Sequence, residues 1–144
     1  MKTVRDILRV KGDAIWSTTA ETSVYEALEK MAHKNVGALV VLDDKGLVGI
    51  FSERDYARKI ILKKRASKHT LVGEIMTREI VCVGRDEKVQ KCMLLMSGHR
   101  VRHLPVIEGE QVIGVISIGD VVHAIISDQE IAIHELEDYI IGRR

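Results

Sequence analysis

The chain has 144 residues, 46% of them hydrophobic, which is enough for one compact domain or for two small modules that share a core. It carries 22 Lys and Arg against 21 Asp and Glu, so its net charge of +1 excludes a global attraction to nucleic acid or to an anionic membrane. No apolar run approaches the roughly 18 residues of a membrane span, and the N-terminal stretch lacks the apolar core of a signal peptide. We therefore expect a cytoplasmic protein without membrane contact.

The first elements alternate between helices and extended segments. Thr3 and Asp6 have the spacing of a capping box and predict a short helical turn at the start. Residues 15–18 are a short strand candidate. Apolar residues at i, i+3, i+4 and i+7 from Val24 predict an amphipathic helix that ends near residues 35–37.

Two apolar runs follow, at residues 38–42 and 47–51, and the polar turn between them predicts a pair of strands. A helix is expected from Glu53, with a cationic outer face that reaches residue 68. The residues expected on its inner face are Tyr56, Ala57, Ile60 and Ile61.

The same order of elements then returns. Residues 24–55 match residues 89–120 without a gap at a shift of 65. The segment G-I-F-S-E-R-D, which ends at Asp55, is therefore equivalent to G-V-I-S-I-G-D, which ends at Asp120. Upstream, residues 4–8 match residues 72–76 at a shift of 68, and the first copy therefore holds three extra residues near Lys11 to Asp13.

Each copy has about 60 residues, which is too few for a comfortable core of its own, so we expect two copies to share one core. The order of helices and adjacent strands predicts an α+β fold, similar to an α/β sandwich, in which helices cover small sheets. We expect one module over residues 1–66, a second over 67–127, and an amphipathic helix over 128–144. The apolar stripe of this tail fits a dimer contact and comprises Ile131, Ile133, Leu136 and Ile140.

The sequence resembles a tandem pair of cystathionine β-synthase (CBS) domains, of the kind found in small stand-alone bacterial proteins. The resemblance covers residues 3–127 and is carried by the two G-h-h-S-x-x-D segments, by V-G-A-L-V-V-L-D and R-H-L-P-V-I at equivalent places, and by V-G-E-I-M-T at the start of the second module. It implies two modules related by a pseudo-two-fold axis, adenine-nucleotide clefts between them, and a homodimer.

In such domains the Asp of the motif holds the ribose, so the resemblance implies this role for Asp55 and Asp120. One carboxylate can accept hydrogen bonds from both ribose hydroxyls. Ser52 and Ser117 are implied near the ribose or phosphate, and Thr18 is a third candidate hydroxyl.

The strand residues near the motif are expected to sandwich the adenine while backbone groups read its edge. Gly49 and Gly114 would permit a close approach of the backbone to the ligand. The residues expected at the adenine are Val36, Gly37, Ala38, Val101 and Leu104.

Phosphate requires positive charge, which the second copy offers in Arg100, Arg102 and His103. In an extended segment both Arg side chains would share one face. Residues 35–38 of the first copy carry no cation, so the two clefts are expected to differ in phosphate affinity. The next candidates for the phosphate are Arg58 and Lys59.

Other interpretations remain open. The segment from Ser52 to Asp55 is also a helix-capping box, which a repeat needs twice without any ligand. The sequence shows no catalytic motif and no metal-ligand spacing, so we expect a non-enzymatic sensor that needs no cofactor and binds AMP, ADP, ATP, NAD or S-adenosylmethionine. The alternative is a structural homodimer without a ligand. Nucleic-acid binding through residues 58–68 is disfavoured because the chain has few aromatic residues for stacking.

Overall fold

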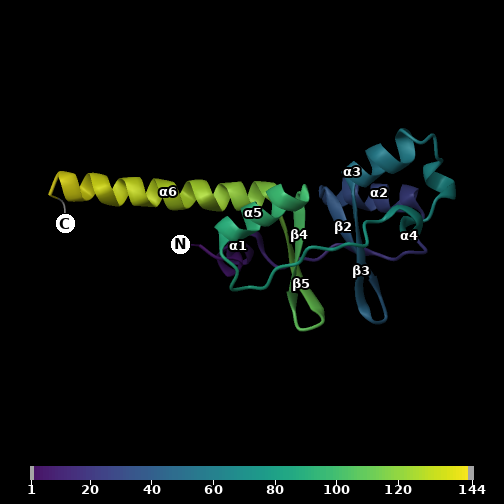
Figure 1. Ribbon diagram of the computed structural model, residues 1–144, viewed down its shortest axis with the longest axis horizontal. Coiled ribbons are helices and arrows are strands. Elements are labelled where there is room, and N and C mark those ends of the chain that lie inside the picture. Colours follow the sequence, from purple (N-terminus) through teal and green to yellow (C-terminus); the bar gives the residue numbers. More distant parts are fainter. Residues whose placement is uncertain (1, 143–144) are drawn as a thin grey trace. The chain divides into compact units, whose positions relative to one another are not determined.

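The computed structural model describes residues 2–142, and its contacts divide them into two compact units. The first-copy unit consists of residues 14–80 and 108–113, and the second-copy unit consists of residues 2–13, 81–107 and 114–142. Each combines helices with a small sheet, which confirms the expected α+β class (Figure 1).

The first-copy unit is built on a three-stranded sheet. β1 (Ser17–Thr18) runs parallel to β2 (Ala38–Asp43), which pairs antiparallel with β3 (Gly46–Ser52). Thr77 extends the sheet beyond β3, because its N–H and carbonyl exchange hydrogen bonds of 2.9 and 3.0 Å with Ile50. The helices of this unit are α2 (Val24–Lys34), α3 (Glu53–Tyr56), the π-helix η1 (Ala57–Ile61), the 3-10 helix η2 (Ser67–His69) and α4 (Val72–Ile75).

Local sequence determines both ends of α2. Ser23 Oγ accepts a 3.1 Å hydrogen bond from the N–H of Glu26, as its capping position predicts. Asn35 ends the helix in the left-handed conformation, with φ of 55°, which Asn tolerates better than most residues. The core that α2 joins contains Val24, Ala27, Met31, Leu39, Val41, Phe51, Ile60, Val72, Ile75 and Met76.

The helix after β3 changes type, and this corrects the inner face expected from the sequence. In η1 the N–H of Leu62 bonds to the carbonyl of Ala57, five residues earlier, at 3.3 Å. A π-turn holds more residues than the 3.6 of an α-turn, so later side chains rotate away from the α-helical face. Ile60 is buried as expected, whereas Ala57 and Ile61 are exposed.

The second-copy unit follows the same plan. β4 (His103–Glu108) and β5 (Gln111–Ser117) form its sheet, and a parallel bridge between Val83 and Val106 stands where β1 stands in the first copy. Its helices are α1 (Val4–Lys11), α5 (Val89–His99) and α6 (Ile118–Ile140), and both α1 and α5 contact α6.

The opening helix of each repeat packs with the other repeat. Residues 2–4 and 87–89 are joined by two reciprocal backbone hydrogen bonds of 2.9 and 3.1 Å, and residues 22–24 and 70–72 are joined in the same way by two of 2.8 Å. α1 therefore belongs to the second-copy unit and α4 to the first-copy unit. The division predicted after residue 66 describes the sequence repeat and not the compact units.

The predicted C-terminal helix is present, but it is not a separate element. It continues the helix that begins at Ile118, so α6 runs unbroken to Ile140 and extends beyond the other elements of its unit (Figure 1). Val121 and Ala124 are its buried residues, and from residue 129 onward its side chains are almost all exposed. Residues 143 and 144 of the predicted tail lie outside the described part of the chain.

Candidate functional site

Asp55 closes a capping box at the start of α3. The N–H and the hydroxyl of Ser52 donate hydrogen bonds of 2.9 and 3.1 Å to Oδ2 of Asp55. In return, Ser52 Oγ accepts a 3.2 Å bond from the N–H of Asp55. The first N–H groups of a helix have no partner inside it, so this pair satisfies groups that the strand-to-helix junction would leave open. The capping interpretation of the motif is therefore correct in the first copy.

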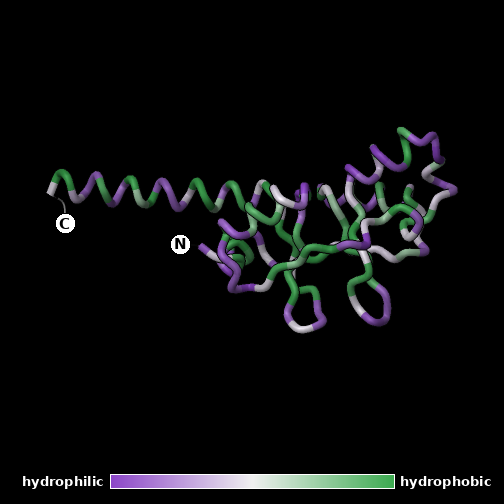
Figure 2. The backbone as a smooth tube through the Cα atoms, in the orientation of Figure 1, coloured by the Kyte–Doolittle hydropathy of each residue, from purple (hydrophilic) through white to green (hydrophobic). Residues whose placement is uncertain are grey.

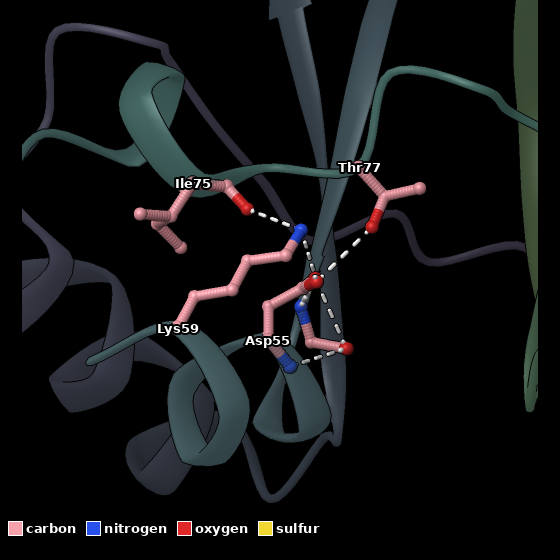
Figure 3. Close-up of polar contacts among 5 residues, drawn as sticks. Asp55, Lys59, Ile75 and Thr77 are labelled. Atoms are coloured by element: carbon pink, nitrogen blue, oxygen red, sulfur yellow. Dashed lines mark hydrogen bonds and ion pairs between the residues drawn. The ribbon is translucent and has the colours of Figure 1, made fainter. Parts of the chain in front are cut away.

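Two further side chains hold the other carboxylate oxygen of Asp55. Thr77 Oγ1 donates a 3.0 Å hydrogen bond to Oδ1, and Lys59 Nζ lies 3.0 Å from the same oxygen. Lys59 also donates a 2.9 Å bond to the carbonyl of Ile75, which fixes its ammonium group between α4 and Asp55 (Figure 3). Asp55 is only 7% exposed. A ribose at this carboxylate would therefore compete with Thr77 and Lys59.

Asp120 repeats the capping box with a different outer partner. The N–H of Ser117 donates a 2.8 Å bond to Oδ2 of Asp120, and Ser117 Oγ accepts a 3.2 Å bond from the N–H of Asp120. Lys11, the last residue of α1, donates a 2.6 Å bond to the same Oδ2 and a 2.8 Å bond to the carbonyl of Val115. The Asp120 side chain is 24% exposed, against 9% for that of Asp55. This carboxylate is the more accessible of the two.

The groups around Asp120 keep it ionised. Burial raises the pKa of this carboxyl, but the hydrogen bonds from Lys11 and from the Ser117 backbone outweigh burial and hold the pKa below its ordinary value. His103 belongs to the same cluster, since burial, Lys11 and Arg102 lower the pKa of its imidazole while Asp120 opposes them. His103 is therefore mainly neutral at pH 7, close to an ionised carboxylate and two cations.

Arg102 lies next to the second capping box. Its carbonyl accepts a 2.8 Å hydrogen bond from the N–H of Ile118, the first residue of α6. In the first copy the carbonyl of Gly37 accepts the equivalent bond, of 3.1 Å, from Glu53. The repeat thus places an arginine where the first copy has a glycine. The two copies therefore differ in charge at this equivalent position. The expected difference in phosphate affinity stays a prediction.

Arg100 does not lie in an extended segment, contrary to expectation. It is the C-cap of α5 and adopts the left-handed conformation, with φ of 55° and ψ of 42°, as Asn35 does after α2. β4 begins only at His103, so strand alternation cannot align Arg100 with Arg102. Both Arg residues are exposed, and their contact with phosphate stays a prediction.

The two cations expected to bind phosphate in the first copy differ in their engagement. Arg58 is exposed on η1. Lys59 is held by Asp55 and by the carbonyl of Ile75. A phosphate contact by Lys59 would break these bonds, so Arg58 is the more available of the two.

The residues expected at the adenine and the third hydroxyl differ in accessibility. Leu104 is fully buried, and its side chain cannot meet a ligand without rearrangement of the core. Only the backbone of β4 at this position remains available for the expected role. Val36, Gly37 and Val101 are partly exposed, whereas Ala38 and Thr18 are buried.

Gly49 and Gly114 each allow a side chain of the protein to pack closely against them. A Cβ atom at Gly49 would lie 2.6 Å from Sδ of Met76, and one at Gly114 would lie 2.8 Å from Cδ2 of Leu8. Met76 and Leu8 are equivalent in the repeat, at the shift of 68. Each glycine therefore lets one side chain from α1 or from the end of α4 pack closely on the strand. This packing role corrects the expectation that the glycines serve the approach of a ligand.

Lys11 and Thr77 are site residues that sequence reasoning missed. Lys11 is the last residue of the opening helix of the first repeat, and Thr77 comes shortly after the opening helix of the second. Each reaches the carboxylate in the unit where that helix packs. The three-residue difference between the copies near Lys11 was the available signal. This difference can be interpreted only when it is known that α1 and α4 each pack with the other repeat, which no local pattern reveals.

Two structural features are absent from the described part of the chain. Within residues 2–142, no helix has the length and apolarity that a bilayer crossing requires. In the same part, no three His, Cys, Asp or Glu side chains come together as metal ligands would. The cytoplasmic location stays a prediction.

Comparison with known proteins agrees with the sequence resemblance. The family model of the CBS domain matches residues 4–62 and 72–127. The mitochondrial CBS domain-containing protein CBSX3 of Arabidopsis thaliana is 43% identical over 150 residues, which cover 97% of this chain and 72% of that protein. The solved structure of a CBS-domain protein from Burkholderia ambifaria is 46% identical, with a TM-score of 0.84 over 89% of this chain and 96% of that one.

A further solved structure carries ligands. The CBS domain pair of protein MJ0100, in complex with 5′-methylthioadenosine and S-adenosyl-L-methionine, is 25% identical, with a TM-score of 0.78 over 89% of this chain and 98% of that one. Proteins built only from CBS domains are generally regulatory rather than catalytic. With both copies matched by the family model, this chain belongs to the CBS-domain family as a tandem pair.

Proposed function

We propose that the protein is a non-enzymatic regulatory module that binds AMP or a related adenosyl ligand, such as ADP, ATP, NAD or S-adenosylmethionine. The observation that carries this proposal is the cluster around Asp120, where Lys11 is bound to an ionised carboxylate and where Lys11, Asp120 and Arg102 all act on the imidazole of His103. A carboxylate suits the ribose diol, and the neighbouring cations suit the phosphate. The adenosyl ligands of the MJ0100 pair support this class of ligand.

Lys11 gives the cluster a means of responding to a ligand. In the structure its ammonium group is bound to Asp120 and to the carbonyl of Val115. When ribose hydroxyls replace Lys11 at Asp120, the ammonium group is free to turn to the phosphate. Lys11 would thus respond to both the ribose and the phosphate of a nucleotide. Adenosine, which lacks the phosphate, would release Lys11 without a new partner for it.

The response itself would be a population shift. A ligand that binds one conformation of the pair more tightly favours that conformation, with a coupling of about 1–3 kcal/mol. We also propose that the protein is a homodimer, through which the shift changes how a partner protein is bound. The exposed apolar side chains of α6 support an association of this kind.

Calorimetric titration with AMP, ADP, ATP, NAD, S-adenosylmethionine and adenosine tests the proposal. We expect at least one nucleotide to bind with a dissociation constant between about 1 μM and 1 mM. Mass spectrometry of small molecules released from the purified protein would identify a ligand without assuming one. The absence of measurable heat with all these compounds, together with no released adenosyl compound, would contradict the proposal.

A structural homodimer without a ligand is the second candidate. The contacts of Asp55 favour it, because both carboxylate oxygens are already engaged by Ser52, Thr77 and Lys59. In that case Asp120 would also serve only its helix cap. Asp120→Asn, which can keep the cap, would then leave nucleotide titrations unchanged, whereas a ribose role predicts a loss of binding.

A further inference from the structure

α6 carries an apolar stripe on the side that faces away from its own unit. Helical residues three, four and seven positions apart share a face. In Figure 2 the C-terminal half of this helix alternates between hydrophobic and hydrophilic turns. The residues of this α6 stripe, with exposures that range from 39% to 71%, are Val122, Ile126, Ile133, Leu136 and Ile140.

The flank of the α6 stripe is acidic. Glu130 and Glu137 follow Ile126 and Ile133 by four residues each, so they lie along its edge, and both are exposed. Residues 118–140 contain no Lys or Arg at all. The surface that α6 offers is therefore apolar in the middle and negative at the edge.

The first-copy unit offers a surface of the opposite charge. In and after η1, Ile61 and Leu62 are 55% and 74% exposed. Arg58, Lys63 and Lys64 beside them are exposed cations. The other three cations of this run are engaged nearby: Lys59 pairs with Asp55, Arg65 with Glu74, and Lys68 lies over the Tyr25 ring.

We propose that the C-terminal half of α6 packs on residues 58–64 of a second copy of this chain. The inference rests on the homodimer of the proposed function and specifies its contact. Ile133, Leu136 and Ile140 meet Ile61 and Leu62, while the glutamates at the edge face Lys63 and Lys64. Because the contact joins two different surfaces of one chain, a two-fold dimer forms it twice.

Charge selects this pairing over contact between two α6 helices. Two α6 stripes side by side would bring their acidic flanks together without any Lys or Arg between residues 118 and 140 to offset them. Like charges across an interface disfavour association, whereas opposite charges favour it and set its register. The second copy supplies both the apolar surface and the missing cations.

Sedimentation analysis over a range of concentrations tests this contact with charge-reversal variants. The acidic side is reversed in E130K/E137K, the basic side in K63E/K64E, and both sides in the quadruple variant. Each double reversal should weaken dimerisation by roughly tenfold to a hundredfold, because two attractive contacts become repulsive at both copies of the interface. The quadruple variant should recover most of the lost dimer affinity. K45E and E110K change exposed hairpin-turn charges of the same types and serve as matched controls that should leave dimerisation unchanged.

The outcomes separate this contact from the rest of the proposed function. A wild-type protein that stays monomeric would contradict both the homodimer and the contact. A dimer that both double reversals change by less than about threefold, or that the quadruple variant fails to restore, would overturn the contact alone. Calorimetry with AMP on the same samples reports the nucleotide proposal independently, and circular dichroism checks that each variant is folded.

Discussion

The ammonium group of Lys11 lies 2.6 Å from Oδ2 of Asp120 and reaches it from the end of a different helix. Its counterpart at Asp55 is Lys59, which follows that carboxylate by four residues and is also bound to Ile75. Each carboxylate of the repeat thus pairs with one lysine, and each of these lysines also donates to a backbone carbonyl, that of Val115 or that of Ile75. The two lysines differ in their place on the chain, because Lys11 is the last residue of α1 whereas Lys59 lies in η1, four residues after its own carboxylate. Because the side chain of Asp55 is 9% exposed and that of Asp120 is 24% exposed, we expect a mainly structural role for Asp55 and propose Asp120 as the carboxylate for a ligand.

The structural role of Asp55 predicts unequal losses of stability. Asp55→Ala removes a helix cap and leaves the Thr77 hydroxyl and the Lys59 ammonium group without their partner, so we expect a loss of about 2–3 kcal/mol in the free energy of unfolding. Asp120→Ala should cost about 1 kcal/mol, because its site is more accessible to water. Urea denaturation followed by circular dichroism measures both. Equal losses would refute the division of roles.

Lys11→Met tests the proposed phosphate role of Lys11. Loss of one charge-assisted contact should weaken AMP binding by roughly tenfold. Adenosine binding should stay the same or become tighter, since Asp120 no longer has to exchange Lys11 for the ribose. Calorimetry with both ligands gives the ratio directly. Lys45→Met, at the exposed β2–β3 turn, is the control, and an equal loss for AMP and adenosine would show that Lys11 acts only on the fold.

Features that depend on local sequence could be predicted. The start of α2 follows from the cap at Ser23, its end from Asn35, and its buried face from helical periodicity. The repeat itself, and with it the family, follows from the spacing that relates Asp55 to Asp120. In each case residues close in sequence carry the information.

Features that depend on distant contacts could not be predicted. Lys11 reaches Asp120, and Thr77 reaches Asp55, only because α1 and α4 pack with the opposite repeat. The π-helix exposes Ile61 through a change of hydrogen-bond spacing that the apolar pattern does not encode. The left-handed conformation of Arg100 differs from these cases, because it could have been predicted. Arg100 is equivalent in the repeat to Asn35, a residue type that often ends helices in this conformation.

His103 predicts a distinct dependence of stability on pH. Its pKa in the folded protein is lowered below the ordinary 6.5 by burial and by Lys11 and Arg102, against the opposing effect of Asp120. The unfolded chain therefore takes up the proton first as the pH falls. The stability that neutral His103 contributes is fully present above about pH 6.5 and is lost as the pH falls through the lower, folded pKa.

His103→Gln should flatten this loss as the pH falls below about 6.5. Urea denaturation at a series of pH values measures the difference between the variant and the wild type, which cancels the carboxylates and the other histidines that both proteins share. His99→Gln, at an exposed position of α5, is the control. A difference that does not change with pH would contradict the folded-state effect at His103.

The close contacts at Gly49 and Gly114 predict a graded response to alanine. At Gly49 the added Cβ would meet Sδ of Met76 at 2.6 Å and the backbone carbonyl of Thr77 at 3.1 Å. The Met76 side chain can change rotamer, but the Thr77 carbonyl accepts a hydrogen bond from Ile50 and cannot yield easily. We expect Gly49→Ala to lower the free energy of unfolding by about 1–3 kcal/mol. At Gly114 the nearest atoms all belong to the Leu8 side chain, which can change rotamer, so Gly114→Ala should cost less.

Gly98→Ala provides a control of opposite sign. Gly98 lies within α5 and has no atom within 4 Å of an added Cβ. Alanine is favoured over glycine in a helix, so this change should raise the free energy of unfolding by about 0.5–1 kcal/mol. Thermal and urea denaturation of the three variants give the order Gly98→Ala, wild type, Gly114→Ala, Gly49→Ala from most to least stable. If Gly49→Ala were as stable as the wild type, close packing of Met76 on β3 would not be the reason for this glycine.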